Sequence, residues 1–245
     1  MKLKFIEDII LTNKGIIPKS FKLAIKNWKI FLVGIVYTIL IIAMLPVISY
    51  AWILGGIILT LFQSALISNY LYLIENIINY GSFSFNDFKS GFTVYLRKIY
   101  IILIIFWFVR YGANLFLRPI IYMNIGGVSL WFIIQVLAFI LLNPLPETIY
   151  QKHHDGLDAI TYSFDFIKEN WLEWFIPNVF IVAIFYLIHA ITDNNISLFS
   201  FSINILNVIV YQIFFAYAMI YRGQLFNVLS TSTRRKRMFM RNMYK

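Results

Sequence analysis

The sequence IFLVGIVYTILIIAMLPVISYAWILGGIILTLFQSALISNYLYLI, residues 30–74, decides the fold class because none of its side chains is charged. One crossing of the hydrocarbon core of a bilayer takes a helix of about 20 apolar residues. The stretch is therefore long enough for two crossings joined by a tight turn. In lipid, only helices or closed β-barrels satisfy the backbone, and barrel strands alternate apolar and polar residues. The unbroken apolar run predicts an all-α, polytopic membrane protein.

The rest of the chain has the same character. Hydrophobic residues make up 60% of the 245 positions and charged residues only 13%, which leaves too little polar surface for a soluble globule. We expect six transmembrane helices, at about residues 30–50, 53–77, 99–117, 125–145, 175–191 and 198–221. Tryptophans gather near the ends of these spans, as in an aromatic belt at the membrane interface; they are Trp28, Trp52, Trp131, Trp171 and Trp174.

Basic residues are distributed unevenly between the two sides of the predicted helices. If both termini lie on one side, that side holds 19 of the 21 Lys and Arg residues, and only Arg110 and Arg118 lie towards the other. The positive-inside rule then places both termini in the cytoplasm. The abundance of Ile, Asn, Lys, Phe and Tyr is typical of an AT-rich bacterial genome, which favours the bacterial plasma membrane as the location.

A motif recurs along the chain and predicts an internal repeat. SFKLAIKNW (residues 20–28) and SFDFIKENW (residues 163–171) share the pattern S-F-x5-N-W, and GFTVYLRKIY begins midway between them at Gly91. Each copy precedes a pair of predicted spans. We therefore expect three pseudo-repeated hairpins, each preceded by an interfacial amphipathic helix, over residues 18–80, 89–152 and 161–225 of a single membrane domain covering residues 1–245.

The stretch LLNPLPETIYQKHHDG, residues 141–156, allows two interpretations. Prolines disfavour a helical conformation in the residue before them, so Asn143 and Leu145 interrupt the fourth span. The interruption is either a stop at the water interface or a helix broken inside the membrane, as at many transport sites. Glu147 lies one repeat length after Glu75, which ends the second span without a nearby proline, so we favour two interfacial carboxylates at cytoplasmic helix ends.

Few polar side chains fall within the predicted spans, and these are the candidate ligand-binding residues. Arg110 lies well inside the third span, where a charge is a functional hypothesis by default. The alternative is that Arg110 extends towards lipid phosphates together with Arg118.

Three amide residues, Gln63, Gln135 and Asn207, recur at the repeat length in the even-numbered spans. They either converge on a polar ligand site or form hydrogen bonds between helices, and the second role is the more common one for amides in membranes.

Two segments near the predicted cytoplasmic side are candidates for further contacts. HHDGLD (residues 153–158) has residue types that bind metals, but adjacent histidines on a helix diverge. We expect Asp155 to cap the following helix, with no metal or cofactor bound.

Residues 156–170 form an amphipathic pattern with Leu157, Ile160, Phe164 and Ile167 on one side. Such a helix lies on the membrane surface or docks a protein partner.

The tail TSTRRKRMFMRNMYK, residues 231–245, carries six basic residues and no acidic one. Each basic residue near an anionic membrane surface contributes about 1 kcal/mol of attraction. We therefore expect this tail to bind anionic lipids of the inner leaflet. A nucleic-acid partner is not expected, because a tail alone lacks the folded basic surface that such partners require.

Two stretches resemble a known group of proteins. NPLPETIYQKHHDGLDAITYSFDFIKENW (residues 143–171) and NYLYLIENIINYGSFSFNDFKSGF (residues 69–92) are similar to segments of bacterial multispan proteins related to the glycerophosphoryl diester phosphodiesterase membrane domain. The resemblance implies a six-helix, non-catalytic membrane module. In that group the hydrolase is a separate domain, and the resemblance assigns no ligand-binding residue to this chain.

The sequence contains none of the short motifs that carry common catalytic mechanisms. There is no H-E-x-x-H, no G-x-S-x-G and no glycine-rich phosphate loop, and the absence of cysteine excludes thiolate chemistry. We therefore expect a non-enzymatic integral membrane protein that acts as an accessory subunit, scaffold or lipid-interacting factor. The alternative is a component of a small-molecule or lipid transporter, with Arg110 as the charge at membrane depth.

Overall fold

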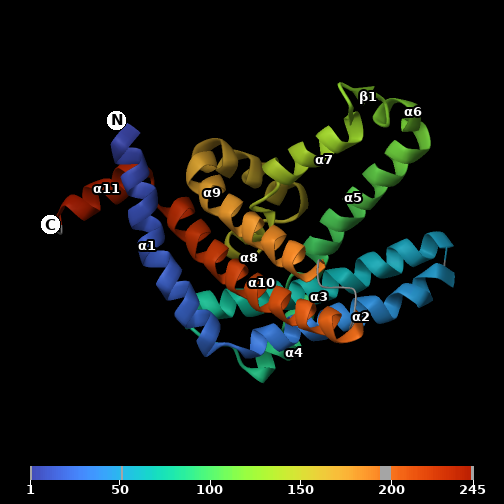
Figure 1. Ribbon diagram of the computed structural model, residues 1–245, viewed down its shortest axis with the longest axis horizontal. Helices are drawn as coiled ribbons and strands as arrows, with labels where there is room; N and C mark the ends of the chain where they lie inside the picture. Colours follow the sequence, from blue (N-terminus) through green and yellow to red (C-terminus); the bar gives the residue numbers. More distant parts are fainter. Residues whose placement is uncertain (1, 51, 194–199, 244–245) are drawn as a thin grey trace. The chain divides into compact units, whose positions relative to one another are not determined.

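The computed structural model describes residues 2–50, 52–193 and 200–243, and these residues are almost entirely helical. Figure 1 shows the elements in chain order. They are α1 (Lys2–Lys26), α2 (Lys29–Tyr50), α3 (Trp52–Tyr80), α4 (Phe85–Val94), α5 (Leu96–Phe116), α6 (Arg118–Ile121), β1 (Asn124–Ile125), β2 (Val128–Ser129), α7 (Leu130–Leu141), α8 (Leu145–Gln151), α9 (Gly156–Asp193), α10 (Ser200–Thr231) and α11 (Arg234–Met243). The two short strands pair antiparallel and close the turn between α6 and α7.

Five segments of the described chain are long and apolar enough to cross a membrane. They are Lys29–Pro46, Leu54–Tyr80, Leu96–Phe116, Leu130–Gln151 and Gly156–Ala190. These findings confirm an all-α chain with several helices that are candidates for spanning a membrane. The sixth expected span overlaps α10, but its first residues, 198 and 199, lie outside the described residues, so a total of six stays a prediction.

The S-F-x5-N-W motif marks a break between two helices. In the first copy, α1 ends at Lys26 and α2 begins at Lys29. Asn27 stabilises this break because its side-chain Nδ2 donates hydrogen bonds to the backbone oxygens of Leu23 (2.9 Å) and Gly81 (3.1 Å). In the other copy, the backbone of Asn170 departs from helical geometry inside α9, with φ −124° and ψ 18°.

The helices pack into two compact units. Unit 1 consists of Met1–Ile39, Leu73–Phe85 and Asn170–Lys245, and unit 2 consists of Leu40–Tyr72 and Asn86–Glu169. Three of the divisions fall inside the long helices α2, α3 and α9, which therefore contribute to both units, and the fourth falls after Phe85, the first residue of α4. Within unit 1, α1 packs along α10 (Figure 1) and also contacts α11.

The packing of α1 on α10 in unit 1 joins residues from the two ends of the chain. The buried side of α1 repeats every four residues, as expected for one face of a helix; it comprises Asp8, Thr12, Ile16, Ser20 and Ala24. Two polar contacts fix the register of the helices. Lys19 Nζ donates to Gln224 Oε1 (2.9 Å), and the Tyr221 hydroxyl bonds to Asn13 Oδ1.

Trp174 does not lie in an aromatic belt, contrary to the expectation from the sequence. Its side chain is completely buried in unit 1, with its ring edge-on to Phe226 (6.1 Å between centroids) and the Arg222 guanidinium 5.1 Å from its centre. Trp28 and Trp171, by contrast, are more than half exposed. Proximity to a span end therefore did not distinguish an exposed tryptophan from one that packs inside the protein.

In unit 2, the short helix α4 packs on α3, and the first part of α9 packs on α8. Ser68 Oγ on α3 donates to the backbone oxygen of Gly91 on α4 (2.7 Å) and accepts from the backbone nitrogen of Tyr95 (2.8 Å). A Cβ at Gly91 would lie 3.0 Å from Asn69 Nδ2 and 3.3 Å from the Asn69 backbone, so glycine permits this close approach. On α8 and α9, the buried hydroxyls of Thr148 and Ser163 share a hydrogen bond of 3.2 Å.

The NPLPE stretch interrupts the helix, as the prolines predicted, but the chain then becomes helical again. Helix α7 ends at Leu141, three residues form a turn, and α8 begins at Leu145. Pro146 is compatible with α8 because backbone N–H groups in the first helical turn have no partner within the helix. Glu147, expected as an interfacial carboxylate, is completely buried.

Candidate functional site

The candidate site lies in unit 2, where α5 ends and the chain turns through α6. Arg110 and Asn114 are four residues apart on α5 and therefore share one face of the helix. The helix ends because Leu117 leaves helical geometry (φ −114°, ψ 10°), and Pro119 follows in the first turn of α6. Arg118 opens α6, so this turn determines where its side chain lies.

Hydrogen bonds hold the centre of this site in place. Asn114 Nδ2 donates to the backbone oxygen of Arg110 (2.9 Å), and the Tyr122 hydroxyl donates to Asn114 Oδ1 (2.9 Å). An open pocket of about 500 Å³ is lined by Asn114, Arg118, Pro119 and Tyr122. The asparagine side chain therefore bridges the helix that carries Arg110 and the turn that carries Arg118.

The site is electrically positive and accessible. The side chains of Arg110 and Arg118 are both exposed, and neither forms an ion pair with any residue in the described part of the chain. Guanidinium groups bind phosphate and carboxylate oxygens through paired N–H donors. The unpaired guanidinium group of Arg118, which lines the open pocket, can therefore bind an anion, and the exposed Arg110 adds positive charge on the same helix as the pocket residue Asn114.

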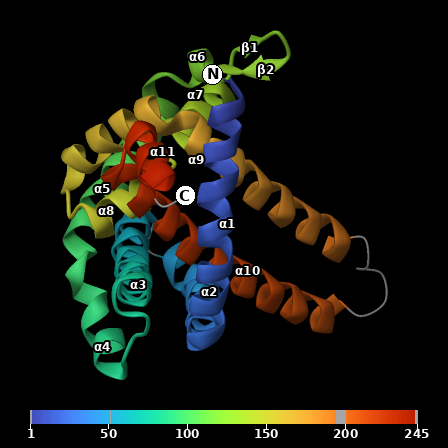
Figure 2. The same ribbon diagram turned by 90° about the vertical axis from the view of Figure 1, so that its left-hand side faces the viewer.

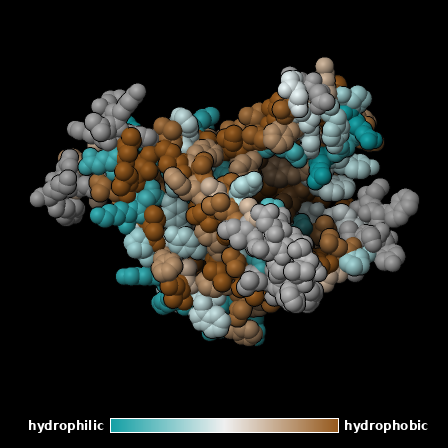
Figure 3. Space-filling model, viewed as in Figure 1, coloured by the Kyte–Doolittle hydropathy of each residue, from teal (hydrophilic) through white to brown (hydrophobic). Residues whose placement is uncertain are grey.

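The surroundings of the site are apolar. Helices α5 and α7 form the two arms of a hairpin closed by α6 and the β1–β2 ribbon (Figure 1). No described side chain of α7 is buried, although its residues are almost all apolar, and on α5 only Ile99 and Ile102 are buried. Figure 3 shows a hydrophobic surface over α7 that becomes hydrophilic at the end of the hairpin near α6. An anion bound here would lie where an apolar surface ends.

The other candidate residues occupy varied positions. Gln63 is half-exposed on α3 and Gln135 is exposed on α7, both in unit 2. Asn207 belongs to α10 in unit 1, and its Oδ1 is buried without a hydrogen-bond partner among the described residues. Their convergence on one ligand stays a prediction. Of the two carboxylates, Glu75 is half-buried on α3, and Glu147 is buried as described above.

The HHDG stretch makes a structural contact. Asp155 pairs with Lys98 (3.0 Å from Nζ to Oδ1), and its backbone oxygen accepts from the backbone nitrogens of Asp158 and Ala159 at the start of α9. The imidazole of His153 stacks on the Tyr95 ring. Across the described residues, no three His, Cys, Asp or Glu side chains lie close enough together to hold a metal ion.

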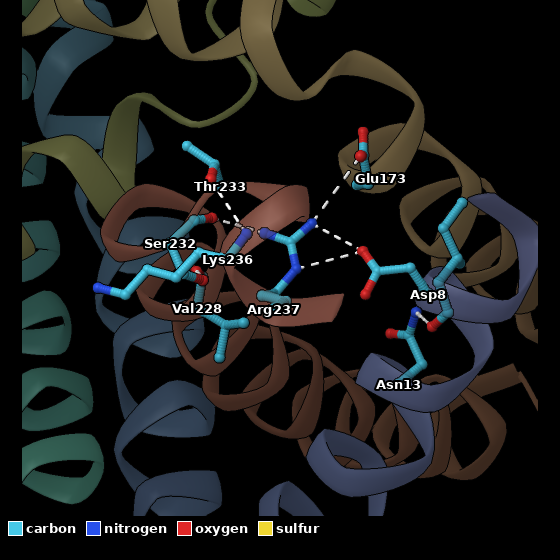
Figure 4. A network of polar contacts seen from close by, with 9 residues as sticks. Asp8, Asn13, Glu173, Val228, Ser232, Thr233, Lys236 and Arg237 are labelled. Atoms are coloured by element: carbon cyan, nitrogen blue, oxygen red, sulfur yellow. Dashed lines mark hydrogen bonds and ion pairs between the residues drawn. The ribbon is translucent and has the colours of Figure 1, made fainter. Parts of the chain in front are cut away.

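A buried charge network in unit 1 was not anticipated from the sequence. Arg237 on α11 donates from Nη2 (2.9 Å) and Nε (3.2 Å) to Asp8 Oδ2 on α1, and its Nη2 lies 3.9 Å from Glu173 Oε1 on α9 (Figure 4). The side chains of Arg237 and Asp8 are 6% and 1% exposed. The position of Asp8 on the four-residue stripe that α1 buries was the signal that could have predicted a basic partner.

Comparisons of this chain with models of protein families, with curated proteins and with solved structures found no match.

Proposed function

We propose that the protein is a non-enzymatic integral membrane protein that binds phosphate groups at the α5–α6 turn and acts as a lipid-interacting accessory subunit or scaffold. The observation that carries this proposal is an open pocket at the end of an apolar hairpin, lined by the unpaired Arg118 and by Asn114, whose side chain bonds to the backbone of the exposed Arg110. A lipid presents its phosphate at the same boundary between apolar and polar surroundings.

Three local contacts support the proposed threefold repeat. Each proposed interfacial helix packs against a helix that ends an even-numbered span: α4 on α3, the first part of α9 on α8, and α1 on α10. The first motif residue is buried in all three copies, at Ser20, Gly91 and Ser163. This common packing is what three copies of one ancestral hairpin would retain.

The distribution of basic residues supports cytoplasmic termini in the bacterial plasma membrane, with the α5–α6 turn outside. Because the chain has no cysteine, single introduced cysteines report topology without a background signal. A cysteine at Tyr122 should react with a membrane-impermeant maleimide in intact cells, and one at Thr233 should react only after the membrane is opened. The opposite pattern would contradict the proposed orientation.

The phosphate site predicts a graded loss of lipid binding. A photo-crosslinking residue at Tyr122 should capture labelled phosphatidylglycerol in bilayers. Replacing Arg110 or Arg118 with alanine should weaken capture roughly fivefold each, since one basic residue near anionic lipid contributes about 1 kcal/mol. Titration of the captured fraction against lipid content measures the effect.

Arg97→Ala is the matched control for this experiment, because Arg97 is exposed at the opposite end of α5. It should leave capture at Tyr122 unchanged. Competition by inorganic phosphate would identify a free anion as the ligand, whereas capture that only phosphatidylglycerol displaces would identify a lipid headgroup. Undiminished capture in the double variant of Arg110 and Arg118 would disprove the site.

One observation favours transport as a second candidate function. Residues 142–144 interrupt the helical segment that includes α7 and α8, and the carboxylate of Glu147 is buried just beyond the interruption. Interrupted helices with buried polar groups form substrate sites in many transporters. Under this alternative, Glu147→Gln would abolish substrate uptake in reconstituted vesicles, whereas Arg118→Ala would leave uptake intact.

A further inference from the structure

Helix α11 in unit 1 is packed with a charged side chain inward and apolar side chains outward. Arg237 is buried against Asp8, whereas Phe239 and Met243 keep 65% and 68% of their surface exposed, and Met240 is also exposed. A helix on a water-soluble protein turns the other way, with its apolar side towards the core. The orientation of α11 therefore fits an apolar environment on its outer side.

The same helix also exposes positive charge. Arg235 and Lys236 are exposed, and within the described residues neither forms an ion pair. A short helix that combines exposed apolar and basic side chains is the pattern of a helix lying in the interface of an anionic membrane. Basic groups attract the lipid headgroups while the apolar groups enter the boundary of the acyl chains.

Helix α1, which contacts α11, has a similar pattern on the side that α10 does not cover. Its exposed apolar residues recur at helical spacing; they are Ile6, Ile10, Ile17 and Phe21. Lysines on this helix are also exposed, and those without a described bond to α10 are Lys14, Lys22 and Lys26. Figure 2 shows α11 beside the N-terminal part of α1, where Asp8 lies.

We propose that α1 and α11 both lie on an anionic leaflet of the membrane, and that the Asp8–Arg237 pair holds α11 in the orientation that presents Phe239, Met240 and Met243 to lipid. The bilayer is the occupant because the same chain carries five helices apolar enough to span it and the exposed charges described on α1 and α11 are positive except for Glu7. This surface is separate from the phosphate site at the α5–α6 turn. A negative result for the α1–α11 surface would leave the proposal of the phosphate site untouched.

The proposal assigns different roles to neighbouring basic residues. Arg237 holds the helix to Asp8 and is not available to lipid, whereas Arg235 and Lys236 contact headgroups. Attraction of α11 to anionic lipid should therefore depend on Arg235 and Lys236. From the sequence alone, the basic residues of the tail cannot be told apart in their roles.

Site-specific fluorescence tests the proposal in the full chain. A single cysteine at Phe239 or at Ile10 carries an environment-sensitive fluorophore, and the protein is placed in nanodiscs of phosphatidylcholine alone or with phosphatidylglycerol. Both probes should shift to shorter wavelength in the anionic nanodiscs. The shift should shrink in 1 M salt, where the screening length falls to about 3 Å. A probe at Met238, which is half-buried on the same helix, should report no difference between the two lipids.

Charge variants and changes in protein concentration distinguish anionic lipid from a second copy of the chain as the occupant of this surface. Arg235→Gln combined with Lys236→Gln should abolish the dependence on phosphatidylglycerol at Phe239 while the melting temperature stays unchanged. Equal emission in both lipids would overturn the proposal. A shift that follows protein concentration instead of lipid charge would also overturn it, because it would identify a second copy of the chain as the occupant.

Discussion

Replacing Arg237 with alanine is expected to release helix α11 from unit 1. The variant leaves the Asp8 carboxylate without the two hydrogen bonds that it accepts from the guanidinium group. Removing one member of a buried ion pair typically costs about 3–5 kcal/mol, because the remaining charge stays buried without compensation. The destabilisation caused by the variant cannot exceed the free energy with which α11 docks on unit 1. Once this limit is reached, the helix detaches and Asp8 returns to water.

Hydrogen exchange measures this release directly. Amides of residues 234–243 should exchange on the order of 100-fold faster in Arg237→Ala, because each 1.4 kcal/mol changes an equilibrium tenfold. In a neutral detergent, which offers no anionic headgroup to Arg235, the variant Arg235→Ala at this exposed position of the same helix should leave exchange unchanged. An apolar pair, Asp8→Leu with Arg237→Met, should recover most of the protection. Equal exchange in the two alanine variants would show that the buried pair does not hold the helix.

Replacing Trp174 with alanine is expected to destabilise unit 1 as a whole. The indole is completely buried, contacts Phe226 edge-on and lies beneath the Arg222 guanidinium. Truncating a buried aromatic side chain to alanine costs about 3–5 kcal/mol, through lost burial and the cavity that remains. Unlike α11, the middle of α9 cannot detach alone, so the cost should appear in global unfolding.

Trp171 provides the matched control on the same helix. Its side chain is 56% exposed, so Trp171→Ala should change the free energy of unfolding by less than about 1 kcal/mol. Unfolding of each variant in mild detergent, followed by circular dichroism, gives the comparison. Similar losses for both variants would mean that Trp174 contributes no more than a tryptophan at the membrane interface.

The helical positions were predictable because an apolar run in lipid has no alternative to the helix. The expected spans at 30–50 and 99–117 match α2 and α5 closely. The break at NPLPE was also predictable from its prolines, but the new helix after it was not. Local rules state where a helix is interrupted, whereas the resumption at Leu145 depends on packing that buries Glu147, Thr148 and Tyr150.

The candidate site was predictable only in part. Arg110 and Arg118 stood out because they are the two basic residues away from the predicted cytoplasmic side. The roles of Asn114 and Tyr122 depend on the turn at Leu117, which brings the tyrosine hydroxyl back to α5. Such a contact follows from three-dimensional geometry that residue spacing does not encode. The pairing of Asp8 with Arg237 is harder still, because no local pattern links positions so far apart.

The separation of Asp8 and Arg237 by 229 residues has a consequence for biosynthesis. At about 5–20 residues per second, a ribosome needs roughly 10 to 45 seconds to reach the arginine after it has added the aspartate. During this interval the nascent α1 lacks both the ion partner of Asp8 and the surface of α10. We expect α1 to reach its final position only after the last helices are made. A chain truncated before α10 would expose the Asp8 carboxylate and the rest of the α1 face that α10 covers in the complete protein, which gives a quality-control protease a feature by which to recognise it.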